Sequence, residues 1–216
     1  GGMLLALGVC AALLDAQKSG KGQVVDAAMT DGSAALMAII FGLKAMGVWT
    51  NNKCKNMLDG GAHFYDAYEC ADGKWVSIGS IEPQFYALLL EKTGITDDQF
   101  KAQMDRDAWP ELKTKLAAVI KSKTRDEWCA IMEGSDVCFA PILDLDEAPK
   151  HPHNAARNTF VQIEGVTQPA PAPRFSRTAC DTPNGPPKAG QHTDTVLTEF
   201  GFAPNEIEKL KSAGAI

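Results

Sequence analysis

The chain has 216 residues, of which 45% are hydrophobic and 22% charged, a balance that supports a folded core and excludes wholesale disorder. Acidic residues (27) outnumber basic ones (21), so the formal net charge is −6, which excludes binding to nucleic acid through overall charge. The longest apolar stretches, 3–14 and 34–43, are too short and too interrupted to span a bilayer, and no secretion signal is recognisable. We therefore expect a cytoplasmic protein with no nucleic-acid or membrane partner.

The cysteines and histidines give no sign of a metal site or of a disulfide framework. The six cysteines are spread along the chain without a Cys-x-x-Cys pair. The one close histidine pair, His151 and His153, has no acidic or cysteine partner at ligand spacing. We expect reduced cysteines that act as small hydrophobic side chains, with no metal and no cofactor.

The first 47 residues are apolar on nearly every side. A helix is predicted over Met3–Leu14, and it ends before Gly20 with basic residues in its last turn. The segment Gln23–Asp26 is predicted as a short strand, and 27–46 as a long apolar helix. Because a helix without a polar face is normally buried on all sides, this part of the chain is expected to belong to a larger core.

The centre of the chain alternates strand and helix signals. Residues 48–65 are polar and rich in glycine and are predicted as a linker. The pair Asp72-Gly73 between two β-prone runs predicts a hairpin, and Pro83 directly after Glu82 predicts the start of a helix. The next predicted elements are helices at 97–103, 109–122 and 125–132, a strand at 137–143 and a short helix near 145–149.

A capping box marks the start of the helix at 125–132, because Thr124 is followed three residues later by Glu127. Further along the chain, six prolines between 167 and 190 predict an extended connector. Two short helices are predicted at the end, over 192–200 and 204–213.

Several widespread catalytic motifs are missing from the sequence. It contains no glycine-rich phosphate loop, no dinucleotide fingerprint and no serine-hydrolase elbow. The pair Gly60-Gly61 either lets the backbone approach a ligand closely or forms an ordinary flexible turn. Glu82, at a strand-to-helix junction, either faces a cleft or caps the helix. The residues alone leave both alternatives open.

Three runs of sequence carry a family resemblance. They are LDGGAHFY at 58–65, YECADGK at 68–74 and GSIEPQFY at 79–86, with support from GKGQVVDAAM at 20–29 and TRDEW at 124–128. Together they closely resemble the α-methylacyl-CoA racemases, a branch of CoA-transferase family III. The likeness runs along the whole chain in one order.

The resemblance implies a mixed α+β fold. Members of the family have a large Rossmann-like domain that binds CoA and a small domain, and two chains interlock with the active site between them. The family's catalytic aspartate and histidine, and most of its CoA-binding surface, would precede residue 1, so the chain is expected to be a C-terminal portion. The implied parts are a large-domain remnant of helix, strand and long helix at 1–47, a linker at 48–65, a small α+β domain at 66–165, a Pro-rich connector at 166–191 and C-terminal helices at 192–216.

The resemblance also implies site residues. Glu82 matches a glutamate that faces the active site across the dimer and assists the histidine base. His63 stands where the family usually has proline; we interpret it as a surface histidine, with a replacement base as the alternative. The implied substrate-binding positions, on the acyl pocket and the glycine turn beside it, are Leu58, Gly60, Gly61, Tyr65 and Ile81.

Racemisation of a 2-methylacyl-CoA thioester removes the α-proton on one face and returns a proton on the other, so it needs two bases and donors for the enolate oxygen. Glu82 alone cannot do both, and we expect a racemase-like protein with little or no activity in isolation. The alternative is a non-catalytic interaction module that pairs with itself or with a complete racemase subunit. The expected partners are an acyl-CoA thioester, if the missing half is supplied, and further copies of the chain in a homodimer or larger oligomer.

Overall fold

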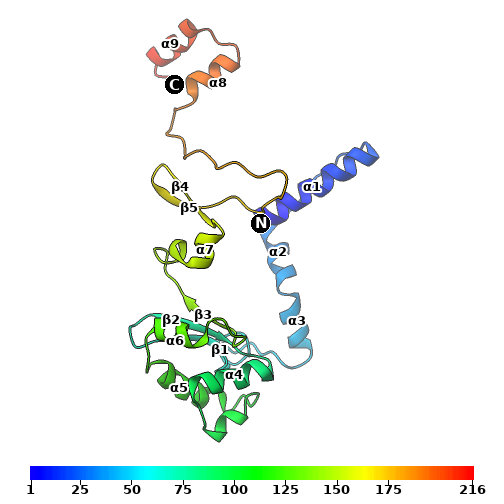
Figure 1. The fold of residues 1–216 in the computed structure, drawn as a ribbon. Coiled ribbons are helices and arrows are strands. Elements are labelled where there is room, and N and C mark those ends of the chain that lie inside the picture. The colour runs from blue at the N-terminus through cyan, green and yellow to red at the C-terminus, as the bar shows by residue number, and fades with distance from the viewer. The chain divides into compact units, whose positions relative to one another are not determined.

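The computed structural model describes all 216 residues and divides them into two compact units, Gly1–Ile142 and Leu143–Ile216. The fold mixes helices with two small antiparallel sheets, of three and two strands, which confirms the predicted α+β class (Figure 1). The small domain was expected to continue to residue 165. The two compact units meet after Ile142 and do not correspond to the predicted parts, whose bounds stay predictions.

The first unit begins with α1 (Gly2–Ser19), α2 (Met29–Leu36) and α3 (Ala38–Ala45). The predicted strand at Gln23–Asp26 does not form, because no other strand lies beside it to accept and donate its backbone hydrogen bonds. The predicted long helix at 27–46 is two helices. It breaks at Met37, where the Met37 N–H donates to the Ser33 and Ala34 carbonyls.

The helix α1 is longer than the apolar stretch that predicts it. It has 18 residues with a mean hydropathy of 1.2, and none of them is buried. By length and composition alone it is therefore long and apolar enough to cross a membrane, contrary to the estimate from residues 3–14. Core helices of soluble proteins have the same length and composition, so this property does not assign α1 to a bilayer.

The rest of the first unit is built on a three-stranded sheet with helices against one face. Its strands follow the order β1-β2-β3, and both neighbouring pairs are antiparallel. The elements are β1 (Tyr65–Glu69), β2 (Trp75–Gly79), α4 (Pro83–Thr93), the 3-10 helix η1 (Asp98–Lys101), α5 (Trp109–Ile120), α6 (Arg125–Met132) and β3 (Phe139–Ile142). The predicted hairpin and the predicted helices α4, α5 and α6 are thereby confirmed.

One hydrophobic core joins this sheet to its helices. The β2 side chains Val76 and Ile78 point into it and are almost fully buried, while their neighbours along the strand point to the opposite face. The segment predicted as a linker also contributes, because Ala62 and Phe64 are fully buried. The core is completed by side chains of α4, α5 and α6 that include Leu89, Leu112, Leu116, Ile120, Trp128 and Met132.

The second unit holds short elements joined by long irregular segments. They are the 3-10 helix η2 (Ala148–Lys150), α7 (Pro152–Ala156), β4 (Phe160–Ile163), β5 (Val166–Pro169), α8 (Thr193–Glu199) and α9 (Pro204–Ser212). The strands β4 and β5 form a hairpin that the sequence analysis did not predict. Residues 170–192, with most of the clustered prolines, contain no helix or strand, as the composition predicts.

Candidate active site

The sheet of the first unit presents its second face to the site. Along β2 the outward residues are Trp75, Ser77 and Gly79, and across the register Gly79 pairs with Tyr65 and Ser77 with Ala140. The Ser77 hydroxyl donates to the Ala140 carbonyl at 3.1 Å, which ties β2 to β3 on this face. Small side chains at the end of β2 leave room above the sheet for a ligand.

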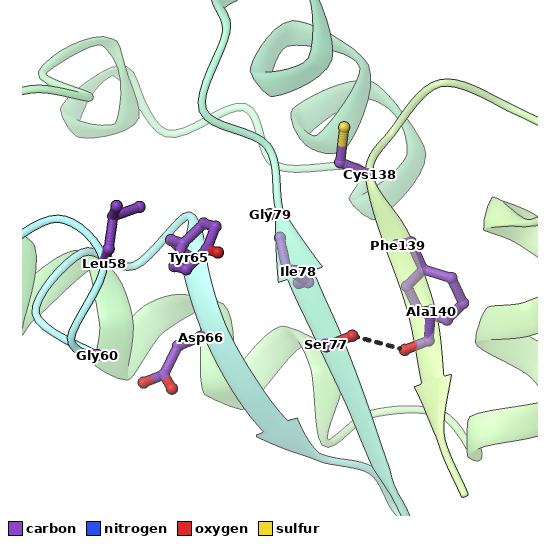
Figure 2. A pocket seen from close by; sticks show the side chains of 10 residues that line it. All are labelled: Leu58, Gly60, Tyr65, Asp66, Ser77, Ile78, Gly79, Cys138, Phe139 and Ala140. Atoms are coloured by element: carbon purple, nitrogen blue, oxygen red, sulfur yellow. Dashed lines mark hydrogen bonds between the residues drawn. The ribbon is translucent and has the colours of Figure 1, made fainter. Parts of the chain in front are cut away.

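A pocket of about 400 Å³ occupies that room, between the sheet and the turn that precedes β1 (Figure 2). All three strands and the turn contribute to it. Figure 2 shows Leu58, Gly60, Tyr65 and Asp66 on one side and the residues of β2 and β3 on the other. The lining residues are Leu58, Gly60, Tyr65, Asp66, Ser77, Ile78, Gly79, Cys138, Phe139 and Ala140.

The glycine turn, residues 58–61, is held from behind by the buried side chain of Asn56. The Asn56 amide group donates to Asp59 at 2.6 Å and to the Thr50 carbonyl at 3.1 Å, and its oxygen accepts from the Thr50 N–H at 2.7 Å. Burial opposes ionisation of Asp59, but the hydrogen bonds from Asn56 and from the backbone hold the pKa of its carboxyl below the ordinary value. Gly60 has a φ of +85°, which favours glycine, so the tight turn needs the residue found there.

Lys113 of α5 connects the glycine turn to the sheet. Its ammonium group donates to the Gly60 carbonyl at 2.7 Å and forms an ion pair with Asp66 of β1. Gly60 and Asp66 line the pocket, whereas Lys113 lies behind them. The sequence analysis did not identify Lys113, because nothing in a lone lysine on a helix indicates a partner 53 residues earlier.

Glu82 stands at the other end of the site, directly before α4. Its backbone is extended, its carboxylate makes no capping hydrogen bond, and its side chain is exposed. The Gln103 amide holds the backbone just before it, donating to the Ile81 carbonyl at 2.8 Å. Burial and then the negative charges of Glu82 and Asp136 raise the pKa of the Cys138 thiol, which lines the pocket. The alternative that the Glu82 side chain caps α4 is therefore not supported.

His63 is a core residue and not a surface histidine, so that interpretation is wrong. The ring is 0% exposed and packs edge-on against Phe64, Tyr86 and Phe100. The Tyr86 hydroxyl donates its one proton to the Phe100 carbonyl at 2.8 Å, so the contact of 2.7 Å between His63 Nε2 and the Tyr86 oxygen requires Nε2 to be the donor. Nδ1 is then unprotonated, and it has no hydrogen-bond partner.

Burial also sets the protonation state of this histidine, because it lowers the pKa of His63 to about 4. The ring is therefore neutral at physiological pH. His63 does not line the pocket, and its Nδ1 atom is buried in the core without a hydrogen-bond partner. The alternative of a replacement base is not supported by this geometry.

Some of the predicted site residues line the pocket, and others lie next to lining residues in the sequence without lining it themselves. Leu58, Gly60 and Tyr65 line one pocket. Gly61, Ile81 and Glu82 adjoin its two ends but do not line it, and their roles stay predictions. The sequence analysis missed the β2 and β3 lining residues; the alternation along 75–79 carries a signal for Ser77 and Gly79, but nothing local indicates that β3 completes the wall. No group of three or more metal-ligating side chains gathers anywhere in the chain.

The fold and the pocket thus define an α+β protein in which a small sheet and a glycine turn line a pocket of about 400 Å³. The chain belongs to CoA-transferase family III, whose sequence profile matches residues 1–193. It is 43% identical to the α-methylacyl-CoA racemase of Mus musculus and 42% identical to that of Homo sapiens, each over 98% of this chain. The resemblance inferred from the sequence motifs is confirmed.

Solved structures agree on the fold. The CAIB/BAIF family protein from Brucella suis matches 92% of this chain and 53% of its own with a TM-score of 0.72 at 22% identity. Rv3272 from Mycobacterium tuberculosis matches 89% of this chain and 51% of its own with a TM-score of 0.67 at 23% identity. The chain covers 56% of each of the two racemases, so it spans about half the length of its curated relatives.

Proposed function

We propose that this chain is the acyl-binding portion of an α-methylacyl-CoA racemase, an enzyme that epimerises 2-methylacyl-CoA thioesters. The observation that carries the proposal is the pocket between the glycine turn and the outer sheet face, with Glu82 three residues after Gly79, which lines it. Leu58 and Tyr65 supply apolar surface for an acyl chain. Glu82, exposed and without a capping hydrogen bond, is free to support a base that acts on the α-proton.

The same geometry argues that these 216 residues alone have little or no racemase activity. Moving a proton from one face of the α-carbon to the other takes a base on each side. Glu82 is one exposed carboxylate, the other carboxylate at the pocket, Asp66, is paired with Lys113, and His63 is sealed in the core. The second base and the donors for the enolate oxygen would come from the part of the relatives that this chain does not cover.

Exchange of the α-proton into deuterated water tests the proposal. The chain is incubated with each enantiomer of 2-methyldecanoyl-CoA, alone and with the N-terminal part of the mouse racemase that it does not cover, and the α-proton is followed by NMR. We expect exchange only in the mixture. There Glu82→Gln should slow exchange about 100-fold, while Glu91→Gln, an exposed acid on α4, should leave the rate unchanged. Fast exchange by the chain alone, or full activity of Glu82→Gln in the mixture, would contradict the proposal.

A non-catalytic interaction module is the second candidate, and the apolar surface of α1 and α3 favours it. Neither helix has a buried residue, and both expose large hydrophobic side chains such as Leu7, Leu13, Ile39 and Phe41. This candidate predicts tight association with a complete racemase subunit without any gain of exchange activity. The mixing experiment above separates the two functions.

A further inference from the structure

Lys113 occupies an unusual place on α5. The core-facing side of this helix carries Leu112, Leu116 and Ile120, which are fully buried or nearly so. Lys113 lies beside this row, with its side chain only 34% exposed, and extends toward the start of β1. It reaches two groups of the pocket wall without lining the pocket itself.

Each of the two contacts has a separate effect on the pocket. The hydrogen bond of 2.7 Å to the Gly60 carbonyl fixes the glycine turn, which has no side chain of its own at Gly60 with which to hold itself. The ion pair with Asp66 fixes the neighbouring strand, since the Asp66 carboxylate also accepts from the Ala67 N–H at 2.8 Å. One ammonium group thus sets the distance between the turn and β1.

The ion pair also matters for charge. An unpaired carboxylate at the pocket wall would oppose the negative charge that develops on a thioester oxygen when the α-proton leaves. Pairing with Lys113 neutralises Asp66 at the place where it borders the pocket. The contact therefore keeps the acyl site both fixed in width and free of net negative charge from this wall.

We propose that Lys113 is a positioning residue of the acyl pocket: through Gly60 and Asp66 it holds the glycine turn against β1 and so determines how well the pocket accepts a 2-methylacyl group. The proposal rests on the proposed function of the pocket. It goes beyond that function in assigning a role to a side chain outside the pocket.

A matched pair of lysines tests the proposal. Lys121, directly after α5, also pairs with an acid of β1, Glu69, at 3.0 Å, but contacts neither the turn nor the pocket. The variants are Lys113→Met, Lys113→Arg and Lys121→Met in the full 216-residue chain. The probe is the N-acetylcysteamine thioester of 2-methyldecanoic acid, which carries the acyl group without the nucleotide, and binding is followed through the amide NMR signals of Tyr65 and Gly79.

We expect Lys113→Met to weaken binding of the probe about five-fold or more, and Lys121→Met to change it less than about two-fold. Lys113→Arg keeps the charge and the donors and should restore binding to within about two-fold of the parent chain. Melting temperatures should fall more for Lys113→Met than for Lys121→Met, because Lys113 loses the hydrogen bond to the Gly60 carbonyl as well as a less exposed ion pair. Equal weakening by both Met variants, or no weakening by Lys113→Met, overturns the proposal.

A second measurement decides the matter if the parent chain does not bind the probe, an outcome that would count against the proposed function. In the free chain, Lys113→Met should shift the amide signals of Gly60 and Gly61 and speed their hydrogen exchange, and Lys121→Met should not. Unchanged signals at both glycines in Lys113→Met would show that the lysine does not position the turn.

Discussion

Gly61 has no space for a side chain. A Cβ atom built on it would lie 2.5 Å from the Asn56 carbonyl oxygen and 2.9 Å from the Asn56 nitrogen, and neither backbone atom can move without breaking the network that holds the turn. We expect Gly61→Ala to lower the free energy of unfolding by about 2 kcal/mol. Urea denaturation measures the loss. Gly42→Ala is the control, because a Cβ there meets no atom within 4 Å and should leave stability unchanged or raise it slightly.

His63 makes the stability of the first unit depend on pH. The pKa of His63 is about 4 in the folded chain and about 6.5 in the unfolded chain. Between these two pH values the unfolded state binds a proton at His63 that the folded state does not bind. The contribution of the neutral ring is complete above pH 6.5 and is lost as the pH falls toward 4, by up to about 3 kcal/mol. Denaturation curves between pH 7.5 and 4.5 measure this.

Two variants isolate the histidine from the other titrating groups. His63→Phe keeps a ring in the core but cannot take up a proton, so its stability should fall less steeply over this pH range than that of the parent chain. His192→Gln removes an exposed histidine and should leave the slope as it is. An identical slope in His63→Phe and the parent chain would count against the buried neutral ring.

At the scale of single elements, the start of α6 offers a clean test. The Thr124 side chain accepts from the Glu127 N–H at 3.3 Å, and the Glu127 carboxylate accepts from the Thr124 N–H at 2.8 Å. Thr124→Ala removes half of this capping box and should lower the free energy of unfolding by about 1 kcal/mol. Thr114→Ala, an exposed position within α5, should have almost no effect. Equal losses in the two variants, measured by thermal unfolding, would contradict a specific role of the cap.

Short-range sequence signals correctly predicted the elements that turn or capping residues start or join. The Asp-Gly turn predicted β1 and β2, Pro83 predicted α4, and Thr124 with Glu127 predicted α6. The β4–β5 hairpin was missed because its turn uses Glu164, with a φ of +50°, ahead of Gly165; glutamate at that place is a much weaker signal than asparagine or aspartate.

The candidate site was predictable only in part, for a related reason. The resemblance supplied Leu58, Gly60 and Tyr65, but the wall from β3 depends on pairing with β2 far away in the sequence. The burial of His63 was equally hidden, because its neighbours on the N-terminal side are glycine-rich and polar. What decides its environment is the packing of Tyr86 and Phe100, which no local pattern reports.

At the scale of the whole molecule, the exposed apolar helices of the first unit indicate that copies of the chain associate with one another. Large side chains of α1 and α3 are exposed, and an apolar patch of more than roughly a few hundred Å² is rare on a free monomer. We expect a dimer or larger oligomer that persists at micromolar concentration, measured by light scattering. Leu7→Glu with Leu13→Glu should weaken it, whereas Lys18→Glu on the same helix should not. A monodisperse particle of 23.1 kDa would contradict this.

The molecule as a whole should bind CoA weakly. The CoA-binding surface implied by the family resemblance belongs to the part of the relatives that this chain does not cover, and the lysines beside β1, Lys113 and Lys121, are paired with Asp66 and Glu69. Calorimetric titration with acetyl-CoA should show little or no heat of binding. A dissociation constant in the low micromolar range, about −8 kcal/mol, would overturn the expectation.

The order of the strands has a consequence for how the chain folds. β1 and β2 are neighbours in sequence, but α4, η1, α5 and α6 all lie between β2 and β3. Closing a short loop costs less entropy than closing a long one, so we infer that the hairpin forms early and that β3 joins after the helices have collapsed onto it. Cys138, Phe139 and Ala140 would then be positioned last. During synthesis, a nascent chain in which β3 has not yet joined the sheet would therefore lack one wall of the pocket, and its two-stranded hairpin would depend on the helices for stability.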